Sequence, residues 1–463
     1  MKKIFMLAAA LVAMETAQAQ SELSNASTTG RGGVQNTFVR DYQAIGVNPA
    51  NLGFGAPTVS FTFLEGGLNV SSQAFTRTII KDFSKIEDER TLAMEDRLRY
   101  AKAFTSDNVL NAGVDMNTFA IAVYLPKVGG FGFSNRQRIL GHAGFNKNFS
   151  ELLFLGQEAP VVQQTNEDER VYVHELFDGT ELKASWVNEW NLSYGRKLVS
   201  LPAVAIYAGV GYRYLQGLAL YELSAKDGEV KAYSASSPVL DFDYERYLDD
   251  PQFRYGGANN QLSPVGKGHG YDVGLSAEIA KTVKVSLSVT DMGSMRWSKN
   301  LLQGQDKGFY LSDIISAEEY DFEDVADVAQ QIIDTALAFT PVNELKTDLP
   351  TRFRAGVGAK LGNKVEVGVD YVHALNNAPG NLSQDFFGLG VDVMPTSFFR
   401  FSTGVSTGAG EKLNLPIGIA FIAQSYEFGI STRDITAPLT ENNPGASFAF
   451  AFLRFKIGNQ ESL

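Results

Sequence analysis

One stretch of the sequence carries a motif for nucleophilic catalysis. Residues 404–408 read Gly-Val-Ser-Thr-Gly and place Ser406 at the centre of a G-x-S-x-G pattern. In hydrolases this pattern works because the serine sits on a sharp turn from a strand into a helix, within reach of a histidine and an acid. Here the motif ends an alternating stretch, and no helical pattern follows it. The context therefore argues against a serine nucleophile.

Side chains for redox and metal chemistry are sparse. The absence of cysteine excludes disulfides, thiolate metal sites and cysteine nucleophiles. The histidines are far apart and form no H-E-x-x-H motif; they are His142, His174, His269 and His373. We therefore predict no catalytic residue, no metal site and no cofactor. An enzyme that uses His269 or His373 with a nearby serine and acid remains a rival interpretation.

The charge balance is acidic, with 40 basic and 52 acidic residues and a formal net charge of −12. Because nucleic-acid binding requires phosphate neutralisation, this balance argues against a nucleic-acid partner. A divalent-cation site is one interpretation of the densest acidic run, and a solvated acidic surface is the simpler one. That run contains Glu318, Glu319, Asp321, Glu323, Asp324 and Asp327.

The N-terminus has the pattern of a secretory signal peptide. Lys2 and Lys3 precede an apolar run over 4–14, and Ala17-Gln18-Ala19 forms a small-residue cleavage site before Gln20. We expect residues 1–19 to be removed on export. The run is about half the roughly 20 residues of a membrane helix, and no later window is long and apolar enough to be one. Export without a membrane helix leaves soluble proteins and β-barrels as alternatives.

Alternation with a period of two dominates the chain from residue 57 onward. In 365–371 the residues Val365, Val367, Val369 and Tyr371 share one face, whereas Glu366, Gly368 and Asp370 share the other. A soluble sandwich would bury the apolar face between two sheets, whereas a membrane barrel would turn it toward lipid. The lengths of the connections decide between them.

We predict fourteen strands whose connections are alternately long and short. The turns after the even-numbered strands are very short, and four connections after odd-numbered strands reach about 45 residues or more, at 70–116, 141–185, 223–268 and 294–350. The predicted strands are 57–69, 117–126, 131–140, 186–198, 203–222, 269–280, 282–293, 351–361, 364–374, 384–394, 397–407, 413–423, 425–434 and 446–457.

This pattern predicts an all-β fold, a 14-stranded antiparallel transmembrane β-barrel over residues 57–463. Tight turns would face the periplasm and long loops the outside, in the outer membrane of a Gram-negative bacterium. Two of the loops should be partly helical, over 87–104 and 311–338. The rival enzyme would then be an outer-membrane enzyme. Outer-membrane lipid is a predicted partner.

Several charged residues fall on the predicted inner face of the strands. A charged lumen suits a water-filled or plugged barrel and does not by itself indicate an apolar substrate. The candidates are Glu189, Arg213, Lys284, Arg354, Lys360, Glu366, Asp370, Asp392 and Glu427.

Residues 20–56 are too polar to form a membrane strand. This segment is rich in Gly, Asn, Ser and Thr and contains the tripeptide Asn48-Pro49-Ala50. Asn48 can hold a turn through its side chain and Pro49 fixes φ. Because a fourteen-strand barrel is wide enough to leak, we expect the segment to fold inside the lumen as a hatch or plug. Its residues could gate the barrel or simply pack it.

On these features the chain resembles the FadL-type family of outer-membrane transporters for hydrophobic compounds. Those proteins are fourteen-stranded barrels whose N-terminal hatch carries an Asn-Pro-Ala motif just before the first strand, which here corresponds to Asn48, Pro49 and Ala50. The resemblance implies a porin-like transport function with a hydrophobic small-molecule ligand, such as a long-chain fatty acid. It also implies lateral release of the ligand through the barrel wall.

A related group leaves a second function open. PorV-like accessory barrels of the type IX secretion system share this fold and work with secretion-system proteins, and nothing in the sequence excludes that role. In both cases Phe448, Phe450 and Phe452 resemble the aromatic last strand that the barrel-assembly machinery recognises, which makes that machinery a predicted partner.

Overall fold

The computed structural model describes most of the chain. The described ranges are 25–55, 57–83, 92–104, 108–166, 168–240, 244–257, 262–314, 322–382, 384–409, 411–442 and 444–458. The predicted signal peptide at 1–19 lies outside them, as do residues 20–24 and Ala56 of the predicted hatch.

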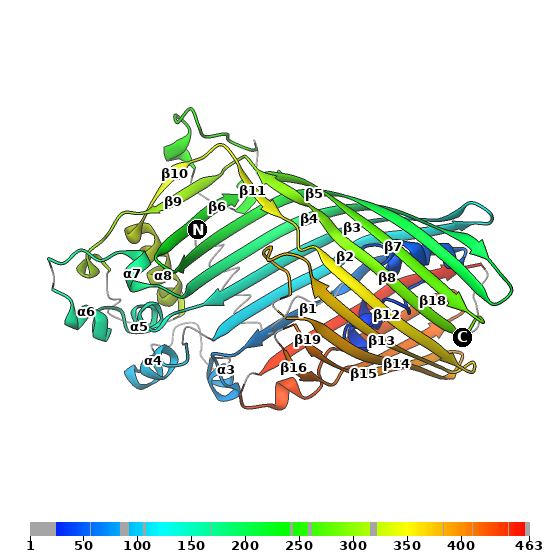
Figure 1. The fold of residues 1–463 in the computed structure, drawn as a ribbon. Helices are drawn as coiled ribbons and strands as arrows, with labels where there is room; N and C mark the ends of the chain where they lie inside the picture. Colours follow the sequence, from blue (N-terminus) through cyan, green and yellow to red (C-terminus); the bar gives the residue numbers. More distant parts are fainter. Residues whose placement is uncertain are drawn as a thin grey trace.

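A closed ring of fourteen antiparallel strands forms the body of the molecule (Figure 1). Each strand pairs with its neighbours in the ring, and the first pairs with the last over Val59–Ile457 to Ser71–Gly445. The ring strands are β1 (Val59–Ser72), β2 (Val109–Leu125), β3 (Gly129–Gly144), β4 (Thr180–Ser200), β5 (Val204–Lys226), β7 (Gly266–Ile279), β8 (Val283–Trp297), β12 (Arg352–Leu361), β13 (Val365–Ala374), β14 (Phe386–Thr396), β15 (Phe399–Gly408), β17 (Ile417–Ala423), β18 (Tyr426–Thr432) and β19 (Gly445–Ile457). The predicted number of barrel strands and the antiparallel closure are confirmed.

The alternation of side chains fixes which face of each strand meets the surroundings. Large apolar side chains on the outward face are exposed, including Val210 (57%), Leu275 (54%) and Val369 (52%) from three different strands. Charged side chains on the inward face are buried. This is the reverse of a soluble protein and the pattern of a transmembrane barrel. No helix among the described residues is long and apolar enough to cross a membrane.

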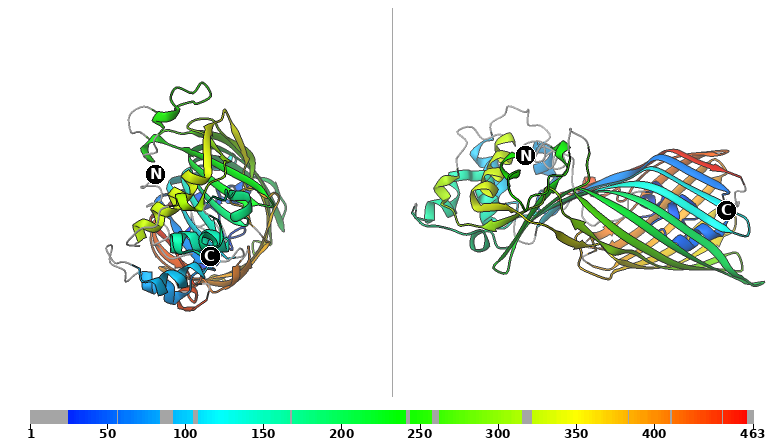
Figure 2. Two further views of the ribbon diagram at one scale, coloured as in Figure 1. Left: turned by 90° about the vertical axis from the view of Figure 1, so that its left-hand side faces the viewer. Right: turned by 90° about the horizontal axis from the view of Figure 1, so that it is seen from above.

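Short helices and extra strands gather at the end of the barrel that carries the long connections (Figures 1 and 2). The helices are α3 (Arg77–Phe83), α4 (Met94–Ala101), α5 (Lys147–Leu155), α6 (Pro160–Gln164), α7 (Val173–Leu176), α8 (Phe322–Ala336), and the 3-10 helices η3 (Gly156–Glu158), η4 (Pro238–Leu240), η5 (Glu245–Tyr247), η6 (Leu311–Asp313) and η7 (Ala437–Leu439). The extra strands are β6 (Glu229–Ser236), β9 (Leu302–Asp306), β10 (Leu337–Pro341), β11 (Leu345–Asp348) and β16 (Glu411–Asn414).

Much of this end forms a cap with its own apolar core. Phe104, Phe149 and Leu152 are buried there with residues from β6 and β10. Helices were predicted within 87–104 and 311–338; α4 and α8 lie in those ranges. Residues 87–91 and 315–321 of those ranges are outside the described part of the chain.

Several barrel strands extend further into the long connections than was predicted from the sequence. β2 begins at Val109 instead of 117, and β4 begins at Thr180 instead of 186. Two of the four long connections also contain extra strands that were predicted as loops: β6 lies in 223–268, and β9, β10 and β11 lie in 294–350. Beyond the membrane both faces of a strand can be polar, so the alternation of apolar and polar residues fades there although the strand continues.

Candidate luminal site

Residues 25–55, hereafter the luminal segment, lie inside the ring (Figures 1 and 2). The segment contains the helix α2 (Ala26–Gly30) and the 3-10 helices η1 (Tyr42–Ala44) and η2 (Pro49–Phe54). α2 packs against β15, β17, β18 and β19, whereas η2 packs against β3, β4, β5 and β7. The segment therefore spans the lumen from one side of the wall to the other.

The tripeptide Asn48-Pro49-Ala50 sits against a part of the wall that has no side chains. The wall residues Gly195, Gly209 and Gly274 come from β4, β5 and β7. A Cβ atom would lie 2.1 Å from the Pro49 oxygen at Gly195, and 2.0 Å from Asn48 Oδ1 at Gly274. Any larger residue would collide with the tripeptide, so these glycines form its seat.

Asn48 is fully buried and joins the segment to two strands. Its Oδ1 accepts a hydrogen bond from the Ala50 N–H and caps η2. Its Nδ2 lies 2.6 Å from Ser286 Oγ and 3.1 Å from the Leu287 oxygen. These partners use both amide hydrogens and leave no spare donor.

A layer of charged side chains lies directly beside this seat along the barrel. The Arg213 guanidinium is fully buried and donates to Glu189, Asp272 and Asp291 at 2.7–3.0 Å. It also donates to the Gly46 oxygen of the luminal segment at 3.2 Å. The layer continues through Arg138, Arg136 and Asp115 on the neighbouring strands. It holds the segment by charge-assisted hydrogen bonds.

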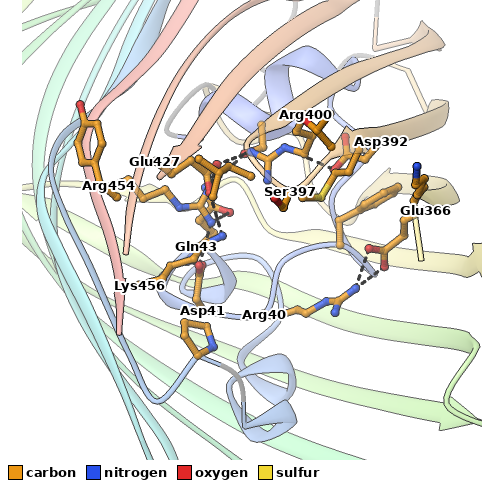
Figure 3. Close-up of a pocket in the computed structure, with 18 of the residues that line it drawn as sticks. Arg40, Asp41, Gln43, Glu366, Asp392, Ser397, Arg400, Glu427, Arg454 and Lys456 are labelled. Atoms are coloured by element: carbon orange, nitrogen blue, oxygen red, sulfur yellow. Dashed lines mark hydrogen bonds and ion pairs between the residues drawn. The ribbon is translucent and has the colours of Figure 1, made fainter. Parts of the chain in front are cut away.

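A second charged cluster joins the segment to the opposite wall, near the short turns (Figure 3). Arg31 donates to Asp392 at 2.8 Å, and Arg40 donates to Glu366 at 2.6 Å. Three cations, those of Arg400, Arg454 and Lys456, converge on Glu427. Arg454 also donates to Asp41 of the segment at 2.8 Å.

A cavity of about 570 Å³ opens beside this cluster. The charged residues Arg40, Glu366, Asp392, Arg400 and Glu427 are among those that line it. Burial of Asp41 favours its neutral form, but the cations of Arg454 and Lys456 outweigh this effect. The pKa of Asp41 therefore lies below its usual value of 3.8.

The structure buries eight of the nine charged candidates on the inner wall, and the ninth, Lys360, is half-buried. Besides the contacts above, Asp370 accepts hydrogen bonds from the backbone N–H groups of Gln35 and Asn36, both at 2.7 Å. Lys284 lies 3.6 Å from Glu366. The set is divided between two places, because Glu189 and Arg213 belong to the first layer and Glu366, Asp392 and Glu427 to the second cluster. Arg354 is buried on β12.

An apolar cluster occupies the lumen on the cap side of the first charged layer. Trp297, Leu215 and Met295 are almost fully buried there, together with Val265 and Leu349. Leu215 is the next inward residue after Arg213 on β5. The inside of the barrel is therefore apolar toward the cap and charged toward the short turns.

The histidines do not come together. His142 contacts Asn111 and Glu181, His174 contacts Asp306, His269 contacts Tyr212, and His373 contacts Asp385. Ser406 lies on β15 with no helix directly after it, and Gly32 of the luminal segment is close to it. The acidic side chains of 318–327 lie outside the described residues.

Comparisons with known proteins agree with this architecture. A mutant of the TodX monoaromatic hydrocarbon channel superposes with a TM-score of 0.52 at 11% identity, covering 94% of this chain and 99% of that one. The toluene transporter TbuX of Ralstonia pickettii gives 0.46 at 11% identity, covering 95% and 99%. A FadL homologue of Pseudomonas aeruginosa gives 0.43 at 10%, covering 95% and 97%. The likeness to the TodX mutant confirms the predicted barrel fold.

A family model matches most of the sequence. No curated protein matches it. Residues 46–432, which include most of the ring and the Asn48-Pro49-Ala50 seat, match a family described as a family of unknown function, DUF5723. The chain belongs to the DUF5723 family.

Proposed function

We propose that this protein is a transport barrel of the Gram-negative outer membrane that passes hydrophobic small molecules, with the luminal segment as its hatch. The observation that carries the proposal is the seat of Asn48-Pro49-Ala50 on Gly195, Gly209 and Gly274. The wall is shaped to receive the segment, and the segment blocks the lumen at that level. Unblocking the barrel requires the segment to shift.

The chemistry of the seat supports a hatch that can be released. Apart from small apolar clusters, such as the one that joins it to Ala120 and Ala122 of β2, the segment meets the wall through hydrogen bonds and ion pairs, including those of Asn48, Arg40 and Arg454. Water can replace such partners when the segment moves, whereas a large apolar contact would resist exposure. Polar contacts of this kind are typical of interfaces that open and close.

The apolar substrate class is supported by the inner surface on the cap side and by the fold. The buried cluster around Trp297 and Leu215 offers apolar contacts beneath the cap. The similar fold of the TodX mutant belongs to a protein described as a monoaromatic hydrocarbon channel. An aromatic hydrocarbon or a long-chain fatty acid is accordingly the substrate class proposed here.

A disulfide lock tests the hatch directly, because the chain has no native cysteine. Ala26 of α2 packs with Ala449 and Ala451 of β19, so A26C/A449C and A26C/A451C would tie the segment to the wall. The control is A420C/G429C, which links two wall strands whose Cβ atoms would lie 3.5 Å apart, a separation that suits a disulfide.

The readout is uptake of radiolabelled toluene and oleate by cells that produce each variant. We expect the segment lock to reduce uptake, a reductant to restore it, and the wall lock to have no effect. Uptake that is equal in the locked and unlocked proteins would refute the hatch.

The charged layer around Arg213 favours a second candidate, a PorV-like secretion accessory. An apolar solute cannot cross that layer without separating the buried Arg213 guanidinium from its three carboxylates, so axial passage is unfavourable. If deletion of the gene leaves hydrophobic uptake unchanged but stops the export of surface proteins, the accessory function replaces the transporter.

A further inference from the structure

Three cations lie side by side on the outer surface of the barrel. Lys267 of β7 pairs with Arg296 of β8, and Arg296 pairs in turn with Lys346 of β11. Directly paired residues of antiparallel strands point to the same side, with Cβ atoms about 4.5 to 5.5 Å apart. All three residues are exposed. Like charges in this arrangement repel each other, so the row favours a bound anion.

Charges of the chain itself do not neutralise the row. Glu344 lies 3.5 Å from Arg296, and Asp348 is two residues beyond Lys346 on the same strand. A fourth cation, Lys299, lines the adjoining groove. Four cations against two carboxylates leave a local excess of positive charge, although the whole chain carries −12.

A groove adjoins the row. It has a volume of about 590 Å³, and its lining includes Lys267, Arg296, Lys299, Glu344, His269 and Tyr271. His269 is the next outward residue after Lys267, and its Nδ1 lies 2.6 Å from Tyr212 Oη. The groove is large enough for a charged headgroup and has donors on more than one side.

The same strand continues from the cationic row into an apolar surface. After Lys267 and His269, the outward residues of β7 are Tyr271, Val273 and Leu275, all exposed. The order along β7 is basic, aromatic and then aliphatic, which matches the passage from the headgroup region to the hydrocarbon of a membrane. A free anion would contact the cations alone, whereas a lipid would contact both the cations and the aromatic and aliphatic side chains that follow them on β7.

From this geometry we infer that the surface formed by Lys267, Arg296 and Lys346 binds the phosphate headgroup of a lipid in the outer leaflet. The phosphate accepts hydrogen bonds from the three cations, and the acyl chains lie along Tyr271, Val273 and Leu275. The inference does not depend on what the barrel transports.

Native mass spectrometry of the full-length barrel in detergent tests this site. The probes are dioleoyl phosphatidic acid, dioleoylglycerol and inorganic phosphate, which separate headgroup from acyl chains. The test variant is K267Q/R296Q/K346Q. The matched control, K147Q/K226Q/K231Q, removes three exposed cations from the cap end.

We expect retention of phosphatidic acid, little retention of dioleoylglycerol, and no competition from equimolar inorganic phosphate. Each cation removed should weaken binding about fivefold, the contribution of one basic side chain near an anionic surface, and the control should bind like the wild type. A shift in gel mobility on heating, retained in both variants, shows that the barrel is intact. Unchanged binding by K267Q/R296Q/K346Q would overturn the lipid site, and so would full competition by inorganic phosphate.

Discussion

The cap and the lumen of this barrel are held together by different physical means. In the cap, Phe104, Phe149 and Leu152 are buried in an apolar core like that of a small soluble domain. In the lumen, the segment meets the wall through buried charges, among them Arg213 and Glu427. Apolar packing is non-directional, whereas charge pairs need partners at fixed places. The cap can therefore tolerate substitutions that the lumen cannot.

The difference also shows how each region can change its state. An apolar core loses stability when it is exposed to water, so the cap is expected to remain folded when the luminal segment moves. A polar interface can exchange its partners for water, which makes the luminal segment the part better suited to move.

Arg213→Met should cause the greatest loss of stability. The substitution leaves Glu189, Asp272 and Asp291 buried without their shared cation, and breaking a buried charge network by removing one partner costs about 3 to 5 kcal/mol. Urea unfolding of the detergent-solubilised barrel, followed by tryptophan fluorescence, measures the change. The control is Arg99→Gln, whose partner Asp96 is on the surface and whose loss should cost at most about 1 kcal/mol. Equal midpoints for both variants would contradict the contrast.

Leu152→Ala should weaken the cap and leave the barrel in place. Leu152 is fully buried in the cap core, and truncation of such a residue costs about 2 to 5 kcal/mol. We expect faster proteolysis of the cap, with the mobility shift of the barrel on heating retained. Leu98→Ala is the control, because Leu98 is 40% exposed. Loss of the mobility shift in Leu152→Ala would mean that cap and barrel unfold together.

How far the sequence could predict this molecule depends on the regularity of each region. The fourteen ring strands follow from alternation because one face meets lipid and the other the lumen. Asp272 lies at an inward-facing position of the predicted strand 269–280, although it was not among the predicted candidates. Asp291 was missed because a bulge with a positive φ of 57° interrupts β8, so Asp291 points inward directly after Thr290.

The partners of the luminal segment could not be read from the sequence for a different reason. Arg31 and Asp392 are 361 residues apart, and no local pattern connects them. Arg40 and Asp41 were likewise absent from the predicted site, although both are charged residues in a segment expected to fill the lumen. The charged candidates on the wall need partners of opposite charge inside the lumen. This requirement could have identified Arg40 and Asp41 from the sequence.

Asn48→Ala should have a moderate effect confined to the luminal segment. The substitution removes the hydrogen bonds to Ser286 and the Leu287 oxygen, each worth about 1 kcal/mol, and the cap of η2. We expect faster tryptic cleavage within the segment at Arg31 and Arg40, with urea unfolding of the wall little changed. Asn148→Ala provides a comparison, since Asn148 bonds a carbonyl within the cap. A cleavage rate equal to that of the wild type would show that Asn48 does not hold the seat.

The smallest predicted effect is the response of the Asp41–Arg454 pair to pH. Burial favours neutral Asp41, but Arg454 and Lys456 outweigh it, so the folded pKa lies below 3.8, whereas an unfolded aspartate has a pKa of about 3.9. A depressed carboxyl pKa stabilises the fold above the unfolded pKa, and this contribution is lost as the pH falls through the folded pKa. The difference in hydrogen–deuterium exchange protection of the luminal segment between the wild type and Asp41→Asn, labelled at each pH and corrected for the intrinsic exchange rate, should stay constant from pH 7 to about 5. It should shrink only below about pH 4. A difference that already disappears between pH 7 and 5 would mean that Arg454 does not control the ionisation of Asp41, and that the charged lumen is weaker than its geometry indicates.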